Sequence, residues 1–112
     1  MGGFQMSDAQ HPIIARRSLL VTYPRGNRTE FEIQIDAPFL TSDDDYCCGV
    51  RSGDVLFAGT QKLYGVDAID AVDYAIQFID AAFANFRDGE IQWPDGTAYK
   101  RLPSSSKFDW GG

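Results

Sequence analysis

Hydrophobic and polar residues alternate along much of the first half of the chain, a pattern that predicts β-strands. The clearest example is residues 30–36, where Phe31, Ile33 and Ile35 occupy every second position between polar neighbours. Successive side chains of a strand point to opposite faces, so one side of the resulting sheet is expected to face water. The predicted strands are residues 13–23, 30–36, 46–51 and 55–64, and turn-forming residues separate them at 24–27, 41–45 and 52–54.

At Gly65 the spacing of the apolar positions lengthens from two to about three and a half, which predicts a helix from Asp67 to about Phe86. Asp67 is a suitable N-cap, and Arg87 and Gly89 supply the signals of a C-terminus. The apolar face expected to pack on the sheet consists of Ile69, Val72, Ile76, Ile79, Phe83 and Phe86. The opposite face carries Asp70, Asp73, Gln77 and Asp80. Because Asp67 already serves the helix dipole, these acidic residues have no predicted structural task.

After the helix, residues 91–93 and 97–99 flank the turn sequence Pro94-Asp95-Gly96 and predict a short closing hairpin. The predicted fold is therefore α+β. An antiparallel sheet of about four to six strands carries one long amphipathic helix on one face, in the order β-β-β-β-α-β-β. We expect a flexible leader at residues 1–11, one domain at 12–102 and a mobile tail at 103–112.

Composition and charge narrow the class of partner. The 112 residues are 44% hydrophobic, which is typical of a globular chain, and 16 acidic against 10 basic residues give a net charge of -6. A surface of that sign repels nucleic acid and attracts a basic protein, although negative charge is also an ordinary aid to solubility. The N-terminus does not resemble a secretory signal, and no apolar run reaches the roughly 18 residues of a membrane span. We therefore expect a cytoplasmic protein without a membrane partner.

Candidate catalytic groups are few. His11 is the only histidine and lies in the predicted leader. Cys47 and Cys48 are adjacent on a predicted strand, so one is expected in the core and the other facing outward. The carboxylates of residues 43–45 belong either to a solvated loop or to a site for a hard cation, but they lack the spacing of a calcium loop. The sequence predicts no catalytic residue, no metal ligand and no cofactor.

The order of these motifs resembles a family of small uncharacterised bacterial α+β proteins, a domain of unknown function. The resemblance covers roughly residues 14–96. It depends on a cysteine-containing strand that ends near Gly53, a helix opening Gly65-Val66-Asp67-Ala68-Ile69-Asp70-Ala71-Val72, and Trp93 with Gly96 in a hairpin. Asp70 stands where the family usually has Gln. Such families look like immunity proteins paired with secreted bacterial toxins, and the resemblance implies no catalytic residue.

The leading hypothesis is a non-enzymatic, immunity-type protein that neutralises a basic secreted toxin by direct binding. Its acidic groups would increase the rate of association with such a partner. The alternatives are a structural subunit of a larger assembly and a metal- or ligand-dependent enzyme that uses the loop of residues 43–45 with Cys47. The oligomeric state stays open. The candidate partner-binding residues are Asp43, Asp44, Asp45, Asp70, Asp73, Gln77 and Asp80.

Overall fold

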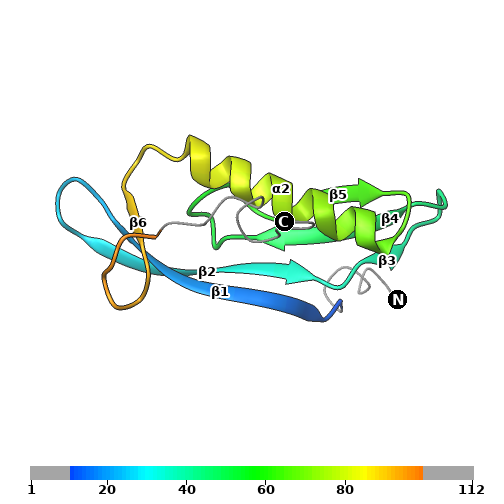
Figure 1. The fold of residues 1–112 in the computed structure, drawn as a ribbon, viewed down its shortest axis with the longest axis horizontal. Helices are drawn as coiled ribbons and strands as arrows, with labels where there is room; N and C mark the ends of the chain where they lie inside the picture. Colours follow the sequence, from blue (N-terminus) through cyan, green and yellow to red (C-terminus); the bar gives the residue numbers. More distant parts are fainter. Residues whose placement is uncertain (1–10, 100–112) are drawn as a thin grey trace, which may run out of the picture.

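The computed structural model describes residues 11–99, which form an antiparallel sheet of six strands with one helix packed on it (Figure 1). The predicted α+β class is confirmed. Residues 1–10 of the predicted leader and the whole predicted tail lie outside the described residues. In chain order the elements are β1 (Ile13–Thr22), β2 (Arg28–Asp36), β3 (Phe39–Leu40), β4 (Tyr46–Arg51), β5 (Gln61–Gly65), α2 (Ala68–Asn85) and β6 (Glu90–Gln92).

The strands follow the order β3-β4-β2-β1-β6, and β5 pairs with β4. One edge of β4 receives two successive segments, β2 and then β3, while its other edge pairs with β5 over the whole length of β5. The helix α2 packs on β4 and β5 (Figure 1). The long β1–β2 hairpin continues the sheet away from the helix, and β6 pairs only with the last three residues of β1.

The β1–β2 hairpin confirms the alternation seen in the sequence. Leu19, Val21, Phe31 and Ile33 are buried in the main core cluster, and the residues between them point to the other side of the sheet. The predicted turn at residues 24–27 is also confirmed, because Gly26 N–H donates to the Tyr23 carbonyl at 2.8 Å. We call the side of the sheet opposite α2 the outer sheet face.

The strand predicted at residues 55–64 is wrong over its first half, and only Gln61–Gly65 form β5. The side chain of Ser52 holds the preceding segment in a loop, since its Oγ accepts the N–H groups of Leu56 at 3.1 Å and Phe57 at 3.3 Å. Asp54 adopts a left-handed backbone with a φ of 65°, and its Oδ1 accepts Gly59 N–H at 2.7 Å. These local side-chain bonds replace the strand ladder that the apolar residues suggest.

The chain order also differs in two short elements. The two-residue strand β3 comes before β4 and has no counterpart in the sequence prediction. After the helix, the predicted hairpin is present, but its second arm is a single bridge between Gln92 and Ala98. Its turn is closed by the bond from Trp93 N–H to the Thr97 carbonyl at 2.8 Å.

The start of α2 is as predicted, but the side of the helix that faces the sheet is as predicted only in part. Asp67 is the N-cap, and its carboxylate accepts Asp70 N–H at 2.8 Å. The prediction that Ile69 and Ile76 belong to the packed face is wrong, because they are 81% and 39% exposed. The other four residues of the predicted face pack on the core, Ile79 as a buried residue and Val72, Phe83 and Phe86 as partly buried ones. Ala71 and Ala75, which were not predicted, are also buried, and we call Ala71, Ala75 and Ile79 the core-facing side of α2.

The close approach of the helix to β5 explains this rotation. A Cβ atom added to Gly65 would lie 2.4 Å from the backbone nitrogen of Ala71, so the first turn of the helix is in direct contact with the end of β5. Only small residues fit between two backbones at that distance. Ala71 and Ala75 therefore occupy this part of the interface, and Ile69 and Ile76 lie on the exposed shoulder of the helix.

Candidate functional site

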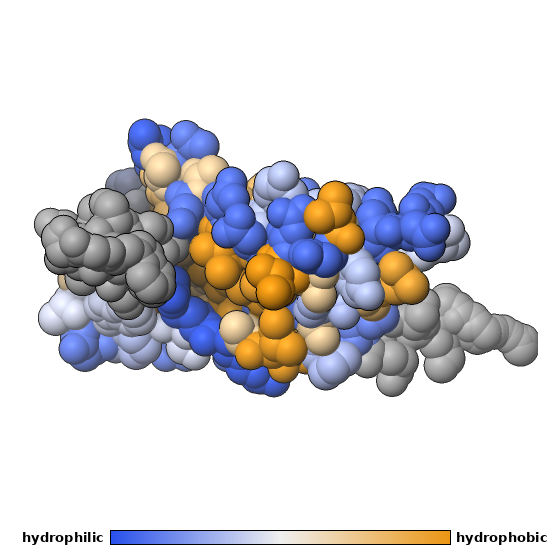
Figure 2. Space-filling view, turned by 45° about the vertical axis from the view of Figure 1, so that its right-hand side comes forward, coloured by the Kyte–Doolittle hydropathy of each residue, from blue (hydrophilic) through white to orange (hydrophobic). Residues whose placement is uncertain are grey.

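The side of α2 turned away from the sheet combines apolar and acidic groups. Val66 and Ile69 are both 81% exposed, and Ile76 follows two turns after Ile69 on the same shoulder of the helix. Asp73 and Gln77 lie beside them and are exposed. We call Val66, Ile69, Asp73, Ile76 and Gln77 the outer helix face. Figure 2 shows one side of the molecule on which apolar surface is exposed among hydrophilic residues.

The acidic residues proposed from the sequence have different roles in the structure. Asp73 lies on the outer helix face, where its Oδ2 accepts the Gln77 side-chain amide at 2.9 Å. Asp80 is half-buried. Asp70 Oδ2 accepts Val66 N–H at 3.0 Å, so Asp67 and Asp70 form a reciprocal cap at the helix start. The expectation that Asp70 has no structural task is therefore wrong.

The loop of residues 43–45 is shaped by its own hydrogen bonds. Thr41 Oγ1 donates to the Asp45 carboxylate and accepts Asp43 N–H at 3.1 Å. Asp44 has a φ of 67°, a left-handed conformation that Asp tolerates better than most residues. Within residues 11–99, no group of three or more His, Cys, Asp or Glu side chains is arranged to hold a metal ion.

The structure brings this loop and the start of α2 to the same end of the sheet (Figure 1). The loop leads directly into Tyr46, and Tyr46 pairs with Gly65, the last residue of β5 before the helix. Asp43 and Asp44 are exposed there, as is Asp73 on the helix. The sequence pattern alone did not predict that the loop and the helix lie at the same end of the sheet. The pairing of β4 with β5 places them there.

Neither cysteine is available as a nucleophile. Cys48 lies in the core cluster as expected, but Cys47 is buried as well, so the expectation that one cysteine faces outward to solvent is wrong. Phe39 and Tyr64 stand directly opposite Cys47 on the two neighbouring strands, and such large side chains restrict solvent access to a small thiol between them. Burial, together with the nearby charge of Asp36, raises the pKa of Cys48 to about 11. A thiol with that pKa is protonated at neutral pH and reacts slowly.

An ion pair on the outer sheet face was not predicted from the sequence. Arg51 donates to both carboxylate oxygens of Asp36, at 2.8 and 2.5 Å, and the Asp36 side chain is only 7% exposed. The hydrogen bond with Asp36 raises the pKa of Arg51, and partial burial opposes this effect. Gly49 makes room for the carboxylate, since a Cβ there would lie 2.8 Å from Asp36 Oδ2. The pair joins β2 to β4 and is structural.

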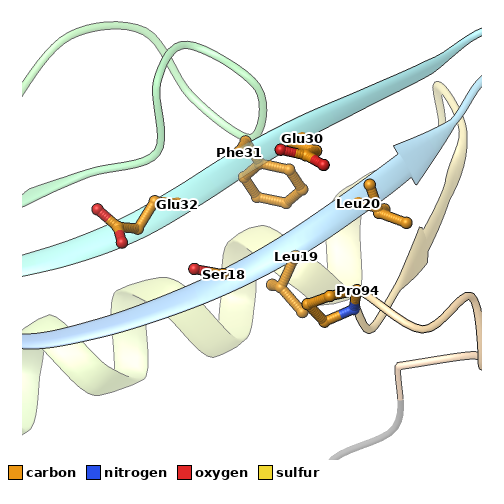
Figure 3. A pocket seen from close by; sticks show the side chains of 7 residues that line it. All are labelled: Ser18, Leu19, Leu20, Glu30, Phe31, Glu32 and Pro94. Carbon is orange, nitrogen blue, oxygen red and sulfur yellow. The ribbon is translucent and has the colours of Figure 1, made fainter.

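A groove lies farther along the outer sheet face, on the β1–β2 hairpin (Figure 3). Its cavity volume is about 410 Å³. Glu32, whose Oε1 accepts the Gln34 amide at 2.7 Å, and Glu30 place two carboxylates at it. Glu32 Oε1 also lies 3.5 Å from Arg16 Nη1, so the chain's own arginine is paired with one of these carboxylates. Its lining residues are Ser18, Leu19, Leu20, Glu30, Phe31, Glu32 and Pro94.

Comparisons with protein-family models, curated proteins and solved structures find no match to this chain. Within the described part of the chain, no helix has both the length and the apolar composition that crossing a membrane requires.

Proposed function

We propose that this protein works by binding another protein, and that the outer helix face is the contact surface. The observation that carries the proposal is the exposure of Ile69 and Val66, each 81% accessible although apolar. Scattered exposed apolar residues are ordinary, but Val66 directly precedes the N-cap of α2, Ile69 lies in the first turn, and Ile76 follows Ile69 two turns later on the same side. Interfaces between proteins commonly have such an apolar centre with polar residues around it.

The charge of the chain supports a basic partner. The net charge is -6, and the exposed carboxylates of Asp43, Asp44 and Asp73 lie at the same end of the sheet as Ile69. Acidic groups around an apolar centre attract a basic protein and raise the rate of association, while the apolar contacts hold the complex together.

The biological role that we propose is that of a cytoplasmic immunity-type protein, which neutralises a secreted toxin by covering its active surface. The resemblance of the helix opening to immunity-type families supports this role. A protein that blocks its target needs a complementary surface and no reactive group. The metal-dependent enzyme built on residues 43–45 has less support, since the Asp45 carboxylate is bonded to Thr41 and Cys47 is buried.

Co-expression with the product of the adjacent gene tests this proposal. We expect the two proteins to co-purify, and cells that express the adjacent product to grow only when this chain is also present. A catalytically inactive form of the adjacent product serves as the control for growth, because it should bind without being toxic. Absence of both co-purification and growth rescue would contradict the proposed function.

A further inference from the structure

The strand β3 ends in an exposed apolar residue at the end of the sheet where α2 begins (Figure 1). Leu40 is 58% exposed. It pairs with Tyr46, and Tyr46 pairs with Gly65, which is in direct contact with the first turn of the helix. Neighbouring strands lie about 4.8 Å apart, so the Cα atoms of Leu40 and Gly65 are roughly 10 Å apart across Tyr46. The end of β3 is therefore close to the start of the helix.

The side chain of Leu40 points to the side of the sheet that carries the helix. Residues directly opposite each other on neighbouring strands project to the same face. Tyr46 packs against the main core cluster beneath α2, so its side chain lies on the helix-bearing face. Leu40 shares that face with Tyr46 but stays largely exposed to solvent.

The exposed shoulder of α2 turns toward β3 rather than toward β5. Ile69, Ile76 and Phe83 follow one another at intervals of seven residues, about two helical turns, and so lie on the same side of the helix. Phe83 stacks on Tyr99 with ring centroids 4.7 Å apart, and Arg17 of β1 donates to the Tyr99 hydroxyl at 2.7 Å. The strand β1 lies on the β2 side of β4, and β3 pairs with that same edge of β4. We call the apolar group formed by this shoulder and β3 the end surface, and its members are Leu40, Tyr46 and Ile69.

Carboxylates lie on both sides of the end surface. Asp43 and Asp44 are exposed in the loop that follows Leu40, and Asp73 is exposed one turn after Ile69. Within residues 11–99 none of these three carboxylates forms an ion pair. An apolar centre with unpaired carboxylates on both sides is complementary to an apolar segment flanked by Lys or Arg.

We propose that β3 belongs to the same contact surface as the outer helix face, and that one apolar segment of a basic partner protein covers the whole end surface. Basic residues that flank this segment lie near the loop of residues 43–45 on one side and near Asp73 on the other. The inference rests on the proposed function and adds a second element of the chain to its interface.

Titration calorimetry with a catalytically inactive form of the adjacent gene product tests the role of Leu40. Leu40→Lys and Leu40→Asp should each raise the dissociation constant at least about tenfold, because both place a charge where an apolar contact is expected. The opposite signs of the two charges separate this contact from the general attraction of an acidic protein for a basic one. Tighter binding by Leu40→Asp would contradict the proposal, because the contribution of this position would then be electrostatic.

Ile14→Lys is the matched control. Ile14 is an apolar strand residue of similar exposure, at 52%, but it lies on β1, which does not pair with β3. This variant should bind as the wild type does, and thermal unfolding should show that all three variants keep the fold. Equal weakening by Leu40→Lys and Ile14→Lys would overturn the proposal, because the added positive charge alone would then explain the effect.

A double-mutant cycle tests whether Leu40 and Ile69 contact the same segment of the partner. Leu40→Ala and Ile69→Ala only shorten exposed side chains, so both variants should fold. Together they should raise the dissociation constant by less than the product of their separate effects, because truncating either residue already loosens the shared segment. A rise equal to that product would show two independent contacts and contradict a single end surface.

The outcomes separate this inference from the proposed function. A wild-type chain that does not bind the adjacent gene product contradicts both. Binding that Ile69→Lys weakens and that both charged variants of Leu40 leave unchanged contradicts the end surface alone, and the outer helix face then remains the contact surface.

Discussion

The two sides of α2 differ in a way that hydrophobicity does not explain. The core-facing side is built from Ala71, Ala75 and Ile79, whereas Ile69 and Ile76 lie on the exposed shoulder. Two large apolar side chains of the helix, Ile69 and Ile76, are thus left in contact with water, although Ile79 is buried. The contact between Gly65 and the first turn of the helix accounts for this choice, since small residues are needed where the two backbones approach each other.

We expect the core-facing side of α2 to determine the stability of the fold and the outer helix face to determine binding. Substitutions on the core-facing side should lower the free energy of unfolding, because that side is closely packed against β4 and β5. Substitutions on the outer helix face should leave it nearly unchanged and alter affinity instead. The following experiments test that separation.

The largest effect is expected for Ile79→Ala. Ile79 is 5% exposed, and its truncation removes buried methyl groups and leaves a cavity, which should lower the free energy of unfolding by about 3–4 kcal/mol. The matched substitution Ile76→Ala, on the exposed shoulder, should cost less than about 1 kcal/mol. Urea unfolding of both variants provides the comparison. Equal losses would contradict the orientation of the helix.

Because the Cys48 thiol is buried beneath the helix, the free energy of unfolding should decrease as the pH rises in the alkaline range. Because the pKa of Cys48 is raised from 9.0 to about 11, the unfolded chain loses this proton at a lower pH than the folded chain. The contribution of the Cys48 thiol to the free energy of unfolding is therefore fully present below pH 9. It falls by roughly 2–3 kcal/mol as the pH rises toward 11. Unfolding of Cys48→Ala across the same range should lack this part of the decline. Identical pH profiles for the two proteins would be inconsistent with a raised pKa.

Gly65→Ala should lower the free energy of unfolding by about 2 kcal/mol, because the new Cβ collides with the backbone of the helix. The atoms in the way are the Ala71 nitrogen and the Asp70 carbonyl carbon, so Ala71→Gly in the same chain should give no rescue. Thermal unfolding of the single and double variants is the measurement. Recovery in the double variant would show that the close approach is made by side chains.

A smaller difference in the free energy of unfolding is expected between alanine substitutions of two aspartates on the same helix. Asp70→Ala removes the bond to Val66 N–H and should cost about 1 kcal/mol, the usual value for a lost cap. Asp73→Ala removes only an exposed bond to Gln77 and should cost less than about 0.5 kcal/mol. If both substitutions cost the same in chemical unfolding, the reciprocal cap does not contribute to stability.

Local patterns in the sequence were sufficient for much of the fold. The alternation around Phe31 and Ile33, the turn at Gly26 and the N-cap at Asp67 depend on neighbouring residues, and the structure confirms each of them. The position of β4 was also clear, because its residues lie between two evident turns.

The rest depends on contacts between distant residues. The rotation of α2 follows from Gly65 and its approach to Ala71, which helical periodicity does not report. The ion pair of Asp36 with Arg51 joins residues 15 positions apart. At the candidate site, the exposed position of Asp73 fits the sequence pattern. The exposure of Ile69 does not, since its spacing assigned it to the core.

The most direct test of the account is the affinity for the adjacent gene product, measured by titration calorimetry on Ile69→Lys and Ile14→Lys. Ile14 is 52% exposed and receives the same change on β1 rather than on the helix. We predict that Ile69→Lys weakens binding at least about 100-fold, which corresponds to roughly 2.7 kcal/mol, while both variants keep the wild-type unfolding temperature. Ile14→Lys should bind as the wild type does. Unchanged affinity in Ile69→Lys would contradict a role for the outer helix face in binding.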